Sequence, residues 1–191
     1  LGLNENIEEY FTDELDFCMA LDFNKTGPDG LRTELGEAEY QIKYQGNHSQ
    51  LSVLESALIE AFGYLPIPPR ESVVVSCVPS DPDSDNVARS LAEGVGEALE
   101  LDFLQSKLFC DKSDMKELPL EEKIPEWQSL YESGECIALD DDVEGLTVVV
   151  IDDLYQSGAT MWCYAKYLKD QGARHVLGLP CVKSLGDGDN Q

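Results

Sequence analysis

Residues 148–160 read Val-Val-Val-Ile-Asp-Asp-Leu-Tyr-Gln-Ser-Gly-Ala-Thr, and this stretch decides the fold class. Its first four residues are apolar and mostly β-branched, which predicts a short buried strand over 147–151. A compact polar loop follows, and apolar residues at helical spacing predict a helix over 160–170. A strand that leads through a short loop into a helix is typical of an α/β fold with a parallel sheet flanked by helices.

The same stretch carries the candidate site. Asp152 and Asp153 stand at the predicted carboxyl end of the strand, where ligands bind in open α/β sheets. The loop formed by Gln156, Ser157, Gly158, Ala159 and Thr160 would offer backbone N–H groups and a helix N-terminus to a phosphate. Carboxylates do not bind phosphate, so we expect Asp152 and Asp153 to bind ribose hydroxyls and a divalent metal. The alternative is a strand–turn–helix unit with an incidental acidic pair.

This pattern resembles the binding signature for phosphoribosyl pyrophosphate (PRPP) in type I phosphoribosyltransferases. The resemblance implies that Gln156 to Thr160 hold the 5-phosphate and that Asp152 and Asp153 contact the 2- and 3-hydroxyls of the ribose. It implies a pentosyltransferase of nucleotide metabolism that uses Mg²⁺ and transfers ribose 5-phosphate to a nitrogen nucleophile, with release of pyrophosphate. Gln156 and Tyr155 depart from the family pattern, because smaller or aliphatic residues are usual at these positions.

A second, weaker resemblance indicates one group within this family. Residues 39–47 are similar to the Leu-Lys-Tyr-x-Gly segment of ComF-type phosphoribosyltransferases, and 77–79 are similar to the Val-Pro loop after their first core strand. By that resemblance Pro79 and Ser80 belong to a loop that contacts the pyrophosphate. The chain lacks the four-cysteine zinc ribbon of that group, and aspartates at 81, 83 and 85 replace the usual arginine. Those aspartates oppose a pyrophosphate unless a metal intervenes.

Residues 105–125 are the candidate for a mobile loop that closes over the reaction. They contain the densest lysine cluster of the chain, at 107, 112, 116 and 123. We expect Lys107 and Lys112 to stabilise the leaving pyrophosphate, while Asp152 and Asp153 stabilise the cationic sugar. A solvated surface loop with ordinary lysines is the equal alternative.

Length, composition and charge limit the classes of protein to which this chain can belong. The 191 residues suit one domain, and a net charge of −25 repels nucleic acids and acidic membranes, so we expect direct binding to neither. The acidity fits either adaptation to high salt or a basic partner. The sequence shows no apolar run of 18 residues and no secretory signal, and its six cysteines form no Cys-x-x-Cys pair. A cytoplasmic protein with reduced thiols, mostly small core residues, is therefore expected.

The chain is predicted to comprise a helical N-terminal region over 1–70, which could form a hood over the acceptor, an α/β core over 71–183 and a flexible tail over 184–191. Helices are predicted over 8–20, 32–44, 51–62, 87–99, 121–131 and 160–170, and strands over 73–78, 101–109, 147–151 and 175–179. Asn86 is the expected cap of the fourth helix, and Gly172 the expected end of the last.

Two rival functions stay open. A non-catalytic PRPP- or nucleotide-binding module with a regulatory or scaffolding role would keep the phosphate loop without the transfer reaction. The aspartates at 81, 83 and 85 favour this alternative. A response-regulator-like phosphoacceptor is weaker, because that fold places its acidic pair near the N-terminus. The resemblance also allows a homodimer.

Overall fold

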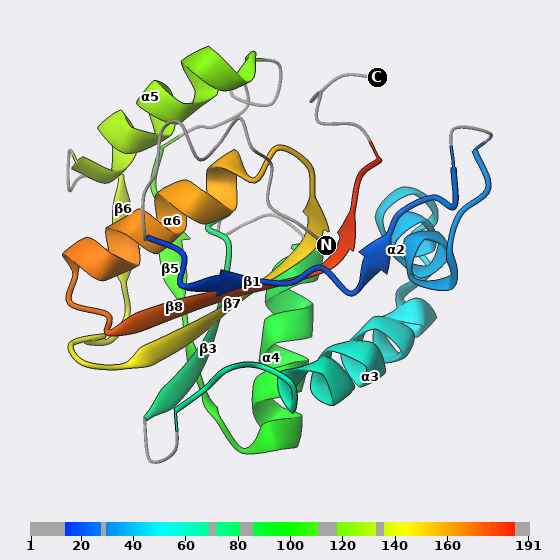
Figure 1. Ribbon diagram of the computed structural model, residues 1–191, viewed down its shortest axis with the longest axis horizontal. Helices are drawn as coiled ribbons and strands as arrows, with labels where there is room; N and C mark the ends of the chain where they lie inside the picture. Colours follow the sequence, from blue (N-terminus) through cyan, green and yellow to red (C-terminus); the bar gives the residue numbers. More distant parts are fainter. Residues whose placement is uncertain are drawn as a thin grey trace.

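The fold is built on one parallel sheet with helices on both faces (Figure 1). A computed structural model describes residues 14–27, 30–68, 72–80, 86–110, 118–132 and 136–185. The strands are ordered β1-β8-β7-β3-β4, and β2 also pairs with β8. Their bounds are β1 Phe17–Cys18, β2 Asp22–Phe23, β3 Val73–Cys77, β4 Asp102–Leu104, β7 Thr147–Tyr155 and β8 His175–Lys183. The predicted fold class is confirmed.

The central strands of the sheet are buried because they consist of continuous apolar runs. Val148 to Ile151 of β7 are fully buried between β8 on one side and β3 on the other. A strand buried on both faces needs apolar residues at every position rather than at alternate ones. In the register, Val149 lies opposite Val75 of β3 and Leu177 of β8. The hydrophobic core is therefore centred on β7.

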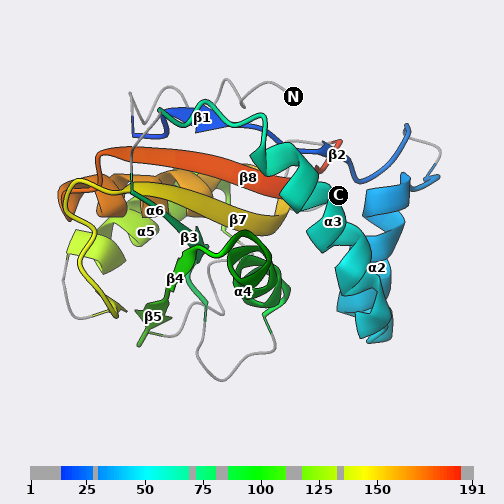
Figure 2. The same ribbon diagram turned by 90° about the horizontal axis from the view of Figure 1, so that it is seen from below.

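The helices cover the two faces unequally. Helices α3 (Leu51–Phe62) and α4 (Val87–Leu99) lie on one face, and α6 (Ala159–Asp170) lies on the other with α5 (Leu120–Glu132) packed outside it (Figure 2). Helix α2 (Glu34–Gln45) packs beside α3 at one end of the sheet, and a 3₁₀ turn, η1 (His48–Gln50), joins the two. The ring of Tyr131 on α5 contacts the rings of Tyr164 and Tyr167 on α6, and Trp127 stacks on Tyr131 from the same helix. Most of the predicted helices are confirmed within two residues of their ends.

The helix predicted over 8–20 is wrong in its described part. Residues 8–13 lie outside the described ranges, whereas Phe17 and Cys18 form β1 and pair in parallel with Leu177 and Gly178 of β8. Hydrogen bonds to the open edge of β8 satisfy this backbone, and they outweigh a local apolar spacing that fits a helix. Strands from the predicted N-terminal region thus join the main sheet, while the boundary at residue 70 stays a prediction.

The strand predicted over 101–109 divides in two. Residues after Gln105 leave the main sheet and form β5 (Ser106–Leu108), which pairs antiparallel with an unpredicted strand, β6 (Ile137–Leu139). A disulfide joins Cys110, two residues after β5, to Cys136, the residue before β6. It corrects the expectation that all thiols are reduced, although Cys77, Cys163 and Cys181 are free and buried as expected.

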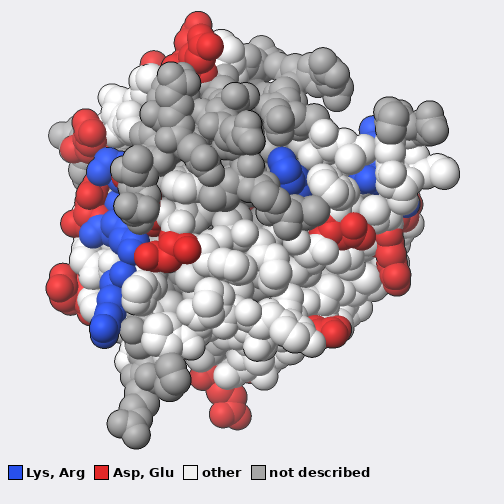
Figure 3. Space-filling model, viewed as in Figure 1, with Lys and Arg blue, Asp and Glu red and all other residues white. Residues whose placement is uncertain are grey.

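Charge is unevenly spread over the surface. Figure 3 shows a face with a broad uncharged area and several basic side chains on the right, near α2. Other basic side chains lie at the left edge, which is formed by the end of α6 and the start of β8. There Lys169 contacts Asp16 at 2.7 Å, and Lys166 contacts Asp170 at 2.9 Å. Of the helices in the described part of the chain, none is both long and apolar enough to span a membrane.

Candidate functional site

The candidate site lies at the point of the sheet from which the following strands are added on opposite sides. From β3 the chain crosses through α4 to β4 on one side, whereas from β7 it crosses through α6 to β8 on the other. β3 and β7 are neighbours, so the two connections diverge between their carboxyl ends. Ligands of open α/β sheets bind at such a switch point. The predicted acidic pair, the predicted phosphate loop and the Pro79–Ser80 loop all begin there.

The acidic pair lies inside β7 rather than after it. The strand was predicted to end at 151, but its pairing with β8 continues from Asp152 opposite Pro180 to Tyr155 opposite Lys183. The extra pairing follows from β8, which is also longer than predicted and offers hydrogen-bond partners to this end of β7. Both carboxyl groups are half-buried and hydrogen-bonded locally: Asp153 N–H donates to Asp152 Oδ1, and Leu154 N–H donates to Asp153 Oδ1, each at 3.0 Å.

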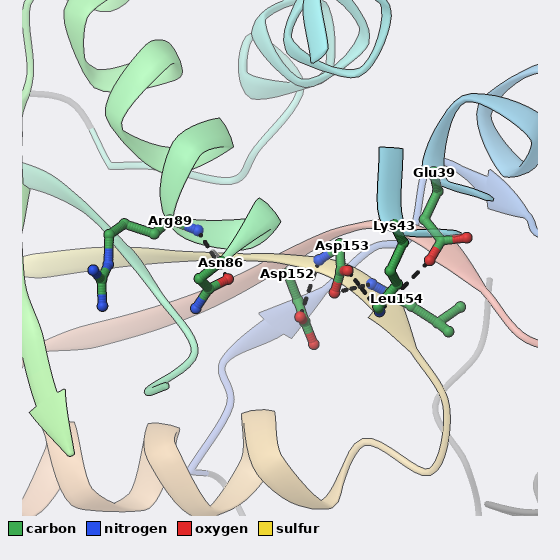
Figure 4. Close-up of polar contacts among 7 residues, drawn as sticks. All are labelled: Glu39, Lys43, Asn86, Arg89, Asp152, Asp153 and Leu154. Carbon is green, nitrogen blue, oxygen red and sulfur yellow. Dashed lines mark hydrogen bonds and ion pairs between the residues drawn. The ribbon is translucent and has the colours of Figure 1, made fainter. Parts of the chain in front are cut away.

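A lysine from α2 completes the acidic pair. Lys43 Nζ lies 2.7 Å from Asp153 Oδ2 and 3.6 Å from Glu39 Oε1, one helical turn away on α2 (Figure 4). The side chain of Asp153 is 15% exposed, whereas that of Lys43 is 36% exposed, so the ammonium group reaches the pair from the more open side. Glu39 is buried, and its Oε1 accepts no hydrogen bond from the described residues.

The three acids and the lysine influence one another's ionisation. Burial would raise the pKa of Asp153, but the charge and hydrogen bond of Lys43 lower it. Burial and the adjacent charge of Asp153 raise the pKa of Asp152 well above its usual range. Burial opposes the charge of Lys43, yet Asp153 and Glu39 raise its pKa. Asp153 and Lys43 therefore favour each other's charged forms, and Asp152 is the carboxyl group of the pair whose pKa is raised.

The predicted phosphate loop joins β7 to the N-terminus of α6. Gly158 is the N-cap residue with φ 84°, a left-handed conformation that favours glycine, and Ala159 N–H donates to Ser157 Oγ at 3.4 Å. Gln156 is exposed and Thr160 half-buried, whereas Ser157, Gly158 and Ala159 are buried. The buried ring of Tyr155 lies under the loop, where its hydroxyl accepts from Trp162 Nε1 at 3.2 Å.

The β3 side of the switch point presents polar groups from the loop and from α4. Pro79 and Ser80 are buried, and Ser80 Oγ accepts hydrogen bonds from Asn86 Nδ2 and, at 3.5 Å, from Arg89 Nη2. Asn86 caps α4 as predicted, because its Oδ1 accepts from Arg89 N–H at 3.3 Å. Figure 4 shows Asn86 and Arg89 at the same end of the sheet as Asp152, with Lys43 and Glu39 beyond the acidic pair.

The candidate catalytic lysines are not brought to the acidic pair by any described contact. Lys107 is exposed on β5, and its backbone forms a bridge with Ser80. Lys112 and Lys116 lie outside the described residues, as does the rest of segment 111–117 of the predicted mobile loop. Lys123 is buried in α5, so it is not a lysine of a solvated loop. The catalytic role of Lys107 and Lys112 stays a prediction.

Two site residues were missed from the sequence. Lys43 and Glu39 lie in the segment that resembles the Leu-Lys-Tyr-x-Gly motif, but nothing in their local spacing indicates a partner 110 residues away. Their separation of four residues on one helix predicts only that both side chains lie on one face of that helix.

The metal-binding role predicted for Asp152 and Asp153 stays a prediction. Within the described ranges, no group of three or more His, Cys, Asp or Glu side chains is arranged to hold a metal. Mg²⁺ demands oxygen ligands in near-octahedral geometry, and an ammonium group already occupies Asp153 Oδ2. A metal bound at Asp153 Oδ2 would compete with Lys43 for that oxygen.

The fold and this edge of the sheet define a parallel α/β protein with a polar switch-point site. No family model matches the chain. No curated protein matches it either. Among solved structures, it is similar to an adenine phosphoribosyltransferase from Thermoanaerobacter pseudethanolicus, with 14% identity, coverage of 74% of this chain and 83% of that one, and a TM-score of 0.45.

Two further structures show the same level of similarity. A purine phosphoribosyltransferase from Pyrococcus horikoshii is 14% identical over 73% of this chain and 85% of that one, with a TM-score of 0.44. A hypoxanthine phosphoribosyltransferase from Staphylococcus aureus is 12% identical over 77% of this chain, with a TM-score of 0.39. The chain spans 64% of the length of that Staphylococcus protein.

Proposed function

We propose that this protein is a phosphoribosyltransferase, which binds PRPP with Mg²⁺ and transfers ribose 5-phosphate to a nitrogen nucleophile. One observation carries the proposal: the acidic pair and the glycine-capped N-terminus of α6 stand on one continuous segment at the switch point of the sheet. Carboxylates suit ribose hydroxyls, and a helix N-terminus suits the 5-phosphate three to seven residues later. The finer proposal is that the protein is a phosphoribosyltransferase of the ComF type, and it rests on the resemblance of residues 39–47 and 77–79 to that group.

The proposed reaction breaks the bond between C1 of the ribose and the pyrophosphate oxygen, and it forms a bond between C1 and the nitrogen of the acceptor. Positive charge develops on the sugar, and the ionised carboxylate of Asp153 would stabilise it. Negative charge develops on the leaving pyrophosphate near Ser80 and the first turn of α4, where N–H groups of the helix favour anions. Mg²⁺ bound to the pyrophosphate would neutralise part of that charge.

A non-catalytic PRPP-binding module is the second candidate. The aspartates at 81, 83 and 85 favour it, because they add negative charge to the loop that, by the family resemblance, would contact the pyrophosphate. Calorimetry with PRPP and Mg²⁺, followed by assays of pyrophosphate release with purine, pyrimidine and amine acceptors, separates the two. Release with any acceptor supports the enzyme, binding without release supports the module, and the absence of PRPP binding contradicts both.

A further inference from the structure

The ammonium group of Lys43 contacts the acidic pair at the position where the sequence predicts a divalent cation. Three carboxylate oxygens of the pair have partners among the described residues: Asp153 N–H, Leu154 N–H and, at 2.7 Å, Lys43 Nζ. The two amides come from the strand itself, so they fix the carboxylates whether or not a ligand is bound. Only the third partner is a charged side chain from another element.

We propose that Lys43 is the resident cation of the acidic pair, so that Asp152, Asp153 and Lys43 together bind the ribose without a metal held by these carboxylates. Any Mg²⁺ then enters with the pyrophosphate of the ligand. This inference rests on the proposed function and deepens it, because it makes Lys43 a residue that positions Asp153 and also lies within reach of the sugar.

The placement of Lys43 is fixed by how α2 is held. Thr33 caps the helix, since its Oγ1 accepts from Gly36 N–H at 3.0 Å and donates to Phe23 O at 2.6 Å. A β-carbon at Gly36 would overlap the backbone of Asn24, so the glycine lets the helix approach the chain after β2. Lys43 lies in the last turn of this anchored helix, where a positive charge is favourable. Because β2 pairs with β8, the sheet itself positions the lysine against β7.

The electrostatic consequence favours an anionic ligand. A protein with a net charge of −25 repels a sugar phosphate, and two bare carboxylates would add to that repulsion. The Lys43 ammonium offsets part of the charge of Asp153 at contact distance, and Lys43, whose side chain is 36% exposed, can also donate a hydrogen bond to a ribose hydroxyl. A second cation of charge +2 at the same oxygens would be repelled by Lys43.

The first test measures metal binding directly and needs no sugar ligand. Mn²⁺, whose free form is quantified by electron paramagnetic resonance, is titrated into the parent protein, Lys43→Met and Lys43→Met/Asp153→Asn. Acidic residues elsewhere bind Mn²⁺ equally in all three, so only the difference matters. We expect Lys43→Met to gain one Mn²⁺ site that the double variant lacks. Equal Mn²⁺ binding by the parent and Lys43→Met would overturn the inference, even if no sugar phosphate binds.

The second test uses ribose 5-phosphate, which has no pyrophosphate to carry a metal. We expect the affinity of the parent to change less than twofold between EDTA and Mg²⁺, whereas Lys43→Met binds at least tenfold more weakly in EDTA and recovers with Mg²⁺. Lys43→Arg retains the charge and should behave like the parent. An increase of tenfold or more with Mg²⁺ in the parent, measurable without any variant, would overturn the inference. If the parent binds neither ribose 5-phosphate nor PRPP, the proposed function itself fails.

Discussion

The hydroxyl group of Tyr155 fills the position that a β-carbon on Gly158 would occupy. Tyr155 is the last residue of β7, and Gly158 is the N-cap of α6, so this contact sets the shape of the loop predicted to bind phosphate. Trp162 Nε1, one turn into α6, donates to the same hydroxyl at 3.2 Å. The bulky tyrosine that departs from the family pattern is thus a structural support of the loop.

Replacing Gly158 by alanine is expected to destabilise the protein by about 2 kcal/mol, because the left-handed backbone costs about 1 kcal/mol and the methyl group meets Tyr155. Urea denaturation of both proteins measures the difference in unfolding free energy. Gly46→Ala is the matched control: Gly46 has φ 65° but nothing within 4 Å of its β-carbon position, so only the backbone cost of about 1 kcal/mol applies. Equal losses at the two glycines would show that Tyr155 does not constrain the loop.

Asp16 holds the start of β1 against β8 and makes part of the stability depend on pH. Its carboxylate accepts from Val176 N–H and contacts Lys169 Nζ, both at 2.7 Å. Burial opposes the charge, but the hydrogen bonds and Lys169 lower the pKa of Asp16 below 3.8. A depressed pKa contributes stability above the unfolded value that is lost as pH falls through the folded value.

We therefore expect Asp16→Asn to lower the unfolding free energy by about 1–2 kcal/mol at pH 7, with a difference from the parent that shrinks as pH falls below 3.8. Denaturation curves between pH 3 and 7 check this. A difference that stays constant through this range would contradict the assignment of Asp16 as the ionised partner.

Glu39 is a buried carboxyl group whose charge is poorly compensated. Burial raises its pKa against the opposing effect of Lys43, so its favourable contribution exists below 4.5 and is lost as pH rises through the folded value. We expect Glu39→Gln to stabilise the protein at pH 7 by on the order of 1 kcal/mol and to make little difference in acid. The exposed Glu97 supplies the control, since Glu97→Gln should change stability by less than about 0.5 kcal/mol. Destabilisation by Glu39→Gln at pH 7 would mean that its ion pair with Lys43 dominates.

The disulfide between Cys110 and Cys136 closes a segment with a sequence separation of 26 residues that includes α5. Thiol titration of the denatured, unreduced protein should find the four free cysteines, and reduction should raise the count to six. Six thiols before reduction would contradict the bond. Replacing both cysteines by serine should lower the unfolding free energy by about 3 kcal/mol, because the open chain gains conformational entropy when it unfolds. A reducing agent should bring the parent down to the same value.

The sequence predicts the centre of this fold well, because the signals there are local and agree. Apolar runs at 73–78 and 147–151 and the capped helix after Asn86 each specify their own element. In the structure the helix has the predicted bounds, β3 is one residue shorter than predicted and β7 is longer. Strands β1 and β6 were missed for the opposite reason. Each has only two or three residues, and pairing with a distant strand decides their conformation rather than their own residue pattern.

The same distinction applies to the candidate site, because some of its residues could be predicted from the sequence and others could not. Asp152, Asp153 and the loop up to Thr160 were predicted together, because one stretch of chain carries both chemical groups. Lys43 could not be predicted, since it reaches Asp153 only after β2, α2 and β8 have assembled. The link between Cys110 and Cys136 likewise depends on the register of β5 with β6, which no spacing in the sequence specifies.

Calorimetric titration of PRPP with Mg²⁺ into the parent protein and three variants tests the central claim most directly. The variants are Asp153→Asn, Thr160→Ala and Asp102→Asn, the last an exposed aspartate at the amino end of β4, on the opposite edge of the sheet. We expect one-to-one binding by the parent, at least tenfold weaker binding by Asp153→Asn and by Thr160→Ala, and unchanged binding by Asp102→Asn. Parent-like affinity in the first two variants, or no binding of PRPP by the parent, would contradict the claim that the acidic pair and the loop hold one sugar phosphate.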